Sequence, residues 1–190
     1  MDSPNSRSPN AETAYLTDIL RTFKNYEALG SAALAQVHQD GDLHRLIDPT
    51  ANSLAIIVKH VSGNLRSRFR NFLTEDGEKP DRDRDDEFEM PVAMSRADIL
   101  ETWKAGWKLA IDSIEALSVE DLHRSVYIRG EAFLVVEALN RSATHIAYHV
   151  GQIVLLARHF AGPAWTSLSV PKGRSRDHAK GEFKTKGIVR

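Results

Sequence analysis

Apolar residues recur along most of the chain at intervals of three and four positions, the spacing that places side chains on one face of an α-helix. Four stretches carry this pattern, and we expect helices over residues 11–37, 50–72, 96–117 and 132–160. Two starts are marked: Pro49 stands where a first-turn proline is tolerated, and Ser95 with Asp98 has the spacing of a capping box. Only residues 126–128 look extended, before Gly130. The pattern predicts an all-α fold, an up-and-down four-helix bundle in one domain.

Charge is distributed unevenly between the segments that flank these helices. The connection over residues 74–90 holds nine acidic residues against three basic ones, whereas residues 163–190 hold seven basic residues against two acidic ones. We divide the chain into a disordered N-terminus (1–10), the bundle (11–162) and a basic C-terminal extension (163–190) that packs on the bundle or is partly disordered. The opposite charges favour contact between the extension and the acidic connection, and the alternative is that both are solvated.

Composition narrows the class of protein. The chain has 190 residues and no cysteine, which excludes disulfides, thiolate metal ligands and a nucleophilic thiol of its own. Its 25 Lys and Arg residues nearly balance its 26 Asp and Glu residues, and this near-neutral charge argues against a dedicated nucleic-acid binder. The polar first ten residues lack the apolar core of a secretion signal, and no stretch is apolar enough to span a membrane. We expect a cytoplasmic protein without a membrane partner.

The expected fourth helix carries the most informative pair of polar residues. From His145 to His149 the spacing is four, so both imidazoles project from one face about one turn apart. The surrounding sequence, HIAYHVGQIVLLA, is apolar almost all round, so the pair points into the bundle. Two neutral imidazoles at this spacing can chelate one metal ion. The alternative is two core histidines that hydrogen-bond to neighbouring groups.

A third histidine lies on an apolar face of the expected second helix. His60 is flanked by Ile56, Ile57 and Val61. Three buried imidazoles are costly without partners, and one metal ion would satisfy them all while leaving a coordination position open for a water or substrate. Hydrogen bonds to serine, tyrosine or carbonyl groups remain the alternative. Asn64, one turn beyond His60, is a candidate to hold substrate or water, or an ordinary polar residue.

Several stretches together resemble a known family. They are IVKHVSGNLRSRF around His60, THIAYHVGQIVLLA around His145 and His149, DGEKPDRDRDDEF in the acidic connection, IRGE before the last helix, and LSVPKGRS in the extension. Over roughly residues 12 to 176 the chain is similar to the DinB-like (YfiT-type) superfamily of metal-binding four-helix bundles, and most similar to a subgroup of unknown function.

The resemblance implies a ligand set and a range of activities. In the superfamily, a histidine of the second helix and a His-x-x-x-His of the fourth bind one divalent ion, commonly zinc or nickel, and these positions are His60, His145 and His149 here. Better understood relatives are transferases and isomerases that use low-molecular-weight thiols. Because this chain has no cysteine, thiol chemistry would need a thiol cosubstrate.

Two functions of different classes follow. The first is a metal-dependent enzyme with a mononuclear His₃ site, of the thiol S-transferase or hydrolase type, acting on a small-molecule substrate. The second is a non-catalytic metal-binding or stress-response module with a structural ion, which a fourth protein ligand would favour. The apolar fourth helix and its Ala147/Gly151 pair also predict a homodimer.

Overall fold

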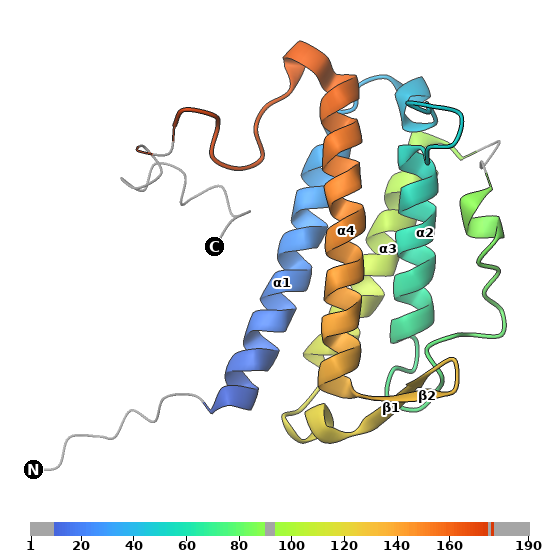
Figure 1. The fold of residues 1–190 in the computed structure, drawn as a ribbon, viewed down its shortest axis with the longest axis vertical. Helices are drawn as coiled ribbons and strands as arrows, with labels where there is room; N and C mark the ends of the chain where they lie inside the picture. The colour runs from blue at the N-terminus through green and yellow to red at the C-terminus, as the bar shows by residue number, and fades with distance from the viewer. Residues whose placement is uncertain (1–9, 90–93, 175, 177–190) are drawn as a thin grey trace, which may run out of the picture.

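The computed structural model describes residues 10–89, 94–174 and 176, and within them the protein is mostly helical with one small sheet. Four long helices lie side by side (Figure 1). Their bounds are α1 Ala11–Leu34, α2 Leu54–Phe69, α3 Arg96–Glu115 and α4 Val135–Ala161. The strands are β1 Ser125–Ile128 and β2 Glu131–Leu134, and single 3₁₀ turns cover η1 Asp40–Leu43, η2 Asp86–Phe88, η3 Glu120–His123 and η4 Gly162–Ala164.

The helices run in an order that differs from the expected up-and-down arrangement. Helix α2 packs against α3 and α4, and α1 packs against the same two helices. Figure 1 shows α2 and α3 running in the same direction, because the connection over residues 70–95 returns the chain to the end where α2 began. This long crossover follows the outer side of α2 and carries nine of the 26 Asp and Glu residues. The prediction of a simple up-and-down order is therefore wrong at this connection.

Helix starts follow local capping. The side chain of Ser95 accepts the Asp98 backbone N–H while the Asp98 carboxylate accepts that of Ser95, so the predicted capping box is confirmed. Helix α2 begins four residues later than expected, because Ser53 caps it by accepting the Ile56 N–H. The Asp48 carboxylate instead accepts the N–H and hydroxyl of Thr50, which makes a local turn rather than a first helical turn.

A short hairpin corrects the all-α expectation. Strands β1 and β2 are antiparallel, with Ser125 opposite Leu134, and α4 consequently starts at Val135 rather than near residue 132. The two turn residues, Arg129 and Gly130, have φ of 59° and 75°. Two consecutive residues with positive φ are typical of the tight hairpin turn that suits the twist of paired strands. The extended backbone expected over residues 126–128 is confirmed as part of β1, whereas residues 132–134, expected to begin the last helix, belong to β2.

The core lies between the four helices and includes both tryptophans of α3. Phe23 of α1 meets Phe69 and Trp107 edge-on, at ring-centroid distances of 5.6 and 6.2 Å. Gly106 allows α2 and α3 to approach closely, since a Cβ there would lie 2.9 Å from the Cα of Ser62.

No helix of the described residues is both long and apolar enough to cross a bilayer.

The two chain ends lie largely outside the described residues. This applies to residues 1–9 of the expected disordered N-terminus and to residues 175 and 177–190 of the basic extension. The described part of the extension lies beside α1 and α4, on the side of the molecule away from the crossover (Figure 1). There Gln36 and the backbone of Thr166 exchange two hydrogen bonds of 2.7 and 3.0 Å. The expected contact with the acidic connection does not occur in this part.

Candidate metal centre

The three predicted histidines meet between α2 and α4. His60 and His149 are buried, with exposed fractions of 3% and 8%, and His145 is half-buried. One ring nitrogen from each residue lies within 4.8 Å of the others. The Nε2 atoms of His60 and His145 are 3.2 Å apart. The structure therefore brings together side chains 85 residues apart in the sequence.

Two of the rings are held by hydrogen bonds from their outer nitrogens. Nδ1 of His60 lies 2.9 Å from the Glu87 carboxylate, and Nδ1 of His149 lies 2.8 Å from Oε1 of Gln152. Each acceptor requires the proton on Nδ1, which leaves the Nε2 lone pair pointing inward. Nδ1 of His145 is buried and has no hydrogen-bond partner in the described part of the chain.

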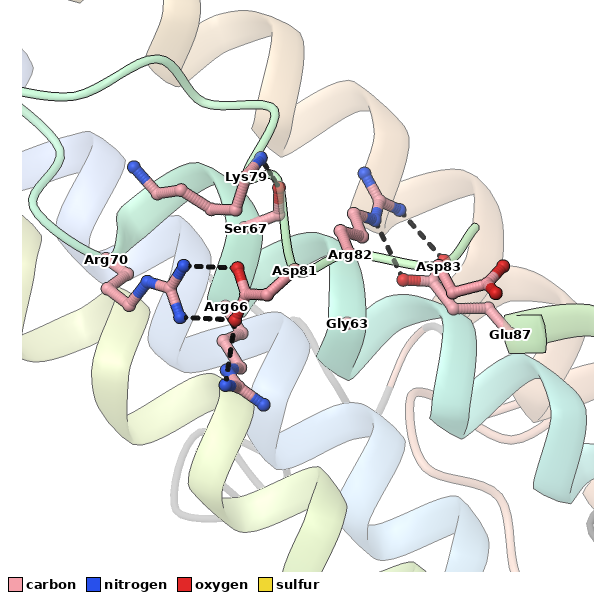
Figure 2. Close-up of a pocket in the computed structure, with 9 residues that line it drawn as sticks. All are labelled: Gly63, Arg66, Ser67, Arg70, Lys79, Asp81, Arg82, Asp83 and Glu87. Atoms are coloured by element: carbon pink, nitrogen blue, oxygen red, sulfur yellow. Dashed lines mark hydrogen bonds and ion pairs between the residues drawn. The ribbon is translucent and has the colours of Figure 1, made fainter. Parts of the chain in front are cut away.

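Glu87 is positioned by a buried arginine and by a glycine of α2. Nε and Nη2 of Arg82 donate to the two oxygens of Glu87, each at 2.8 Å, and Figure 2 shows this paired contact. Both side chains are more than nine-tenths buried. A Cβ on Gly63 would lie 2.2 Å from Oε1 of Glu87, so only glycine leaves room for the carboxylate against α2. Phe88 then covers His60, with a ring-centroid distance of 4.6 Å.

The electrostatics favour the neutral form of His145 and His149 and the ionised form of the Glu87 carboxyl. Burial lowers the pKa of His145 to about 4, and His149 and His60 act in the same direction. Burial also lowers the pKa of His149, against an opposing effect of the Gln152 hydrogen bond. Burial raises the pKa of Glu87, but the hydrogen bonds from Arg82 and His60 outweigh it and hold that pKa below 4.5. Neutral imidazoles beside a carboxylate are the protonation states that a metal site requires.

The donor set fits one divalent ion. Zinc binds histidine nitrogens at about 2.0–2.1 Å, so two nitrogens of a tetrahedral site are about 3.3 Å apart, close to the separation of the two Nε2 atoms of His60 and His145. No fourth His, Asp or Glu joins the group within residues 10–89, 94–174 and 176. Three protein ligands would leave a coordination position for a small molecule.

Asn64 lies beside the histidine cluster, whereas the two tryptophans of α3 and the remaining histidines of the described residues lie elsewhere. Asn64 lines a cavity beside His145, together with Arg129 and Tyr148. Trp103 and Trp107 belong to the core, with ring centroids 5.3 Å apart. The other histidines of the described residues, none of which we assigned to the metal, lie outside the cluster: His38, His44, His123 and His159.

The sequence interpretation missed Glu87, Arg82 and Gly63. Glu87 is one of nine acidic residues in the connection, and nothing in its local sequence separates it from its neighbours. The only available signal was chemical, because a metal-binding histidine needs an acceptor for its second nitrogen. Gln152, three residues beyond His149 on the same helix, is that acceptor for His149.

These features define a helical protein with a histidine cluster between two packed helices. The chain belongs to the family described as "Protein of unknown function (DUF1572)", whose model matches residues 10–174. Comparison with curated proteins and with solved structures gives no match.

Proposed function

We propose that this protein is a metal-dependent enzyme, a DinB-like four-helix bundle whose His60, His145 and His149 hold one divalent ion, zinc or nickel. One observation carries the proposal: three ring nitrogens from two helices converge within 4.8 Å. Hydrogen bonds stabilise this convergence, since Glu87 and Gln152 orient two of the rings. Histidines that merely fill a core do not need their inner nitrogens aimed at one another.

The chain's own groups prepare the site. The Glu87 carboxylate holds the proton on Nδ1 of His60, and Gln152 does the same for His149. When bound, the ion supplies Lewis-acid chemistry, lowering the pKa of a coordinated water or thiol. The reaction class is therefore hydrolysis or thiol transfer to a small-molecule substrate. For transfer, a low-molecular-weight thiol must supply the sulfur because the chain contains no cysteine.

Metal content tests the ligand set directly. Purified protein should carry about one divalent ion per chain by elemental analysis, and His60→Ala, His145→Ala and His149→Ala should each lose most of it. His159→Ala is the matched control, since His159 is exposed on the same helix as two of the ligands. Circular dichroism checks that each variant remains helical. Full metal content in all three ligand variants would refute the ligand set.

Activity separates the enzyme from the alternative of a structural or scavenged ion. Metal-loaded protein should hydrolyse activated esters, or join a low-molecular-weight thiol to an electrophilic acceptor, at rates that fall with metal content across the histidine variants. The three-ligand cluster favours the enzyme, because closed sites with four protein ligands do not bind substrate. Tight binding of one ion with no turnover in either assay would favour the non-catalytic module.

The proposal also includes a cytoplasmic homodimer that pairs through α4. Tyr148 and Leu155 are 65% and 66% exposed on this helix. Gly151 lies between them, and nothing in the described residues would come within 4 Å of a Cβ there. A second copy of α4 fits this face, and a monomer in light scattering at micromolar concentration would contradict the dimer.

A further inference from the structure

A cavity of about 380 Å³ adjoins His145, within the size range of small-molecule sites. Four arginines from four different segments line it. Arg68 comes from α2, Arg84 from the crossover, Arg129 from the hairpin turn and Arg141 from α4. Among the described residues, no aspartate or glutamate shares this lining. The fold thus gathers positive charge beside the candidate metal centre.

Only two of the four arginines that line the cavity are paired with a carboxylate in the part of the chain that the structure describes. The Glu78 carboxylate accepts Nη2 of Arg68 at 3.3 Å and Nε of Arg129 at 2.9 Å, which holds both guanidinium groups in place. Arg84 and Arg141 have no carboxylate partner within residues 10–89, 94–174 and 176. Arg141 lies over the Phe133 ring instead, 5.6 Å from its centroid. The cavity therefore keeps an excess of positive charge.

Two neutral polar groups of the same wall also lack protein partners. Asn64 and Ser142 are more than nine-tenths buried, with exposed fractions of 8% and 6%. Neither side chain makes a hydrogen bond to another described residue, and both line the cavity. Because both side chains line the cavity without a protein partner, both are free to hydrogen-bond to a molecule that enters it.

A second pocket is lined by arginines that all have carboxylate partners within the protein. This smaller space, about 120 Å³, is lined by Glu87 and by other residues of α2 and the crossover (Figure 2). Its three arginines are paired internally: Arg66 and Arg70 with Asp81, and Arg82 with Glu87. An anion entering it would have to displace these carboxylates. The cavity beside His145 imposes no such cost at two of its four arginines.

We propose that the cavity binds the oxyanion group of a small substrate, a carboxylate or a phosphate. Guanidinium groups match this chemistry because they present paired N–H donors to two oxygens. Arg68 and Arg129 form the fixed side of the site, Arg84 and Arg141 close on the anion, and Asn64 and Ser142 contribute neutral hydrogen bonds. This inference rests on the proposed function, in that the remainder of the substrate extends past His145 to the three histidines.

Binding of simple oxyanions tests the proposal without any knowledge of the reaction. Inorganic phosphate and succinate, in separate titrations followed by calorimetry, should bind the wild-type protein with an affinity that falls as salt rises. Arg84→Gln and Arg141→Gln should each weaken binding about tenfold, as expected for loss of a charge-assisted hydrogen bond. The control is Arg158→Gln, since Arg158 is exposed near the end of α4 and does not line the cavity. Preference for phosphate or succinate identifies the oxyanion.

The outcomes separate this proposal from the metal centre. Absence of binding to both anions, or equal weakening by Arg158→Gln, would overturn the oxyanion site. Elemental analysis of the arginine variants should show unchanged metal content, because none of these residues belongs to the histidine cluster. If phosphate binding depends on Arg141 but the protein takes up no divalent ion, the cavity proposal is upheld and the metal-dependent function is refuted.

Discussion

Replacement of Glu87 by glutamine is the sharpest probe of how the histidine cluster is built. The carboxylate accepts three hydrogen bonds: Arg82 Nε on Oε1, and Arg82 Nη2 with His60 Nδ1 on Oε2. An amide has one oxygen and one N–H₂ group, so it can accept at only one of these two positions. The arrangement that keeps most contacts leaves the oxygen facing His60 and sets the amide hydrogens against Arg82.

The magnitude follows from these contacts. One charge-assisted hydrogen bond is lost and its donor is left buried, which costs about 1.5–3 kcal/mol of unfolding free energy in the metal-free protein. His60 keeps an acceptor, but an uncharged one, and loss of such support lowers metal affinity by about 10- to 100-fold. Urea unfolding measures the first quantity, and competition with a chelator of known zinc affinity measures the second.

The control is Glu89→Gln, in the same segment, because Glu89 is exposed and belongs to no ion pair of the described residues. It should change neither quantity. If Glu87→Gln binds zinc as tightly as wild type while its stability falls, Glu87 serves the fold alone and the positioning argument fails. If neither quantity changes, the contacts described for Glu87 do not exist in solution.

Four further results are expected. Gly63→Ala should weaken zinc binding about tenfold by displacing the Glu87 carboxylate, with Gly41→Ala, where a Cβ meets nothing, as control. Ile146→Ala, fully buried in α4, should lower the unfolding free energy by about 2–5 kcal/mol in urea. Chelation of the bound ion should lower the melting temperature, and added zinc should restore it, since a ligand of the native state stabilises that state. Burial raises the pKa of Asp76, but the backbone N–H groups of Glu78, Gly130 and Arg129 outweigh it and hold this pKa below 3.8. Asp76 therefore stabilises the fold above its unfolded pKa and loses this effect as the pH falls through the folded pKa. Asp76→Asn should reduce the melting temperature at about pH 7, and the deficit should shrink as the pH falls through the folded pKa of Asp76. A constant deficit across that range would contradict this assignment.

Local sequence determined those parts of the protein that depend on neighbours a few residues apart. The spacing of apolar residues located four helices, and the Ser95–Asp98 pair marked the start of α3, because helical periodicity and capping act within one or two turns. The same reasoning placed His145 and His149 on one inward face. It failed at Pro49 and at the second strand of the hairpin, where competing local hydrogen bonds and strand pairing override a helical pattern.

Tertiary structure alone decided how distant segments meet. Glu87, Arg84 and Arg129 lie in connections whose paths are set by packing against α2 and by the turn between β1 and β2. No periodicity indicates which of nine acidic residues will reach His60, because that choice depends on the room left by Gly63 and on the partner supplied by Arg82. The sequence therefore determined the helices and their histidines, whereas the crossover of the chain decided what surrounds those histidines. Contacts between residues remote in sequence form only when the whole core packs.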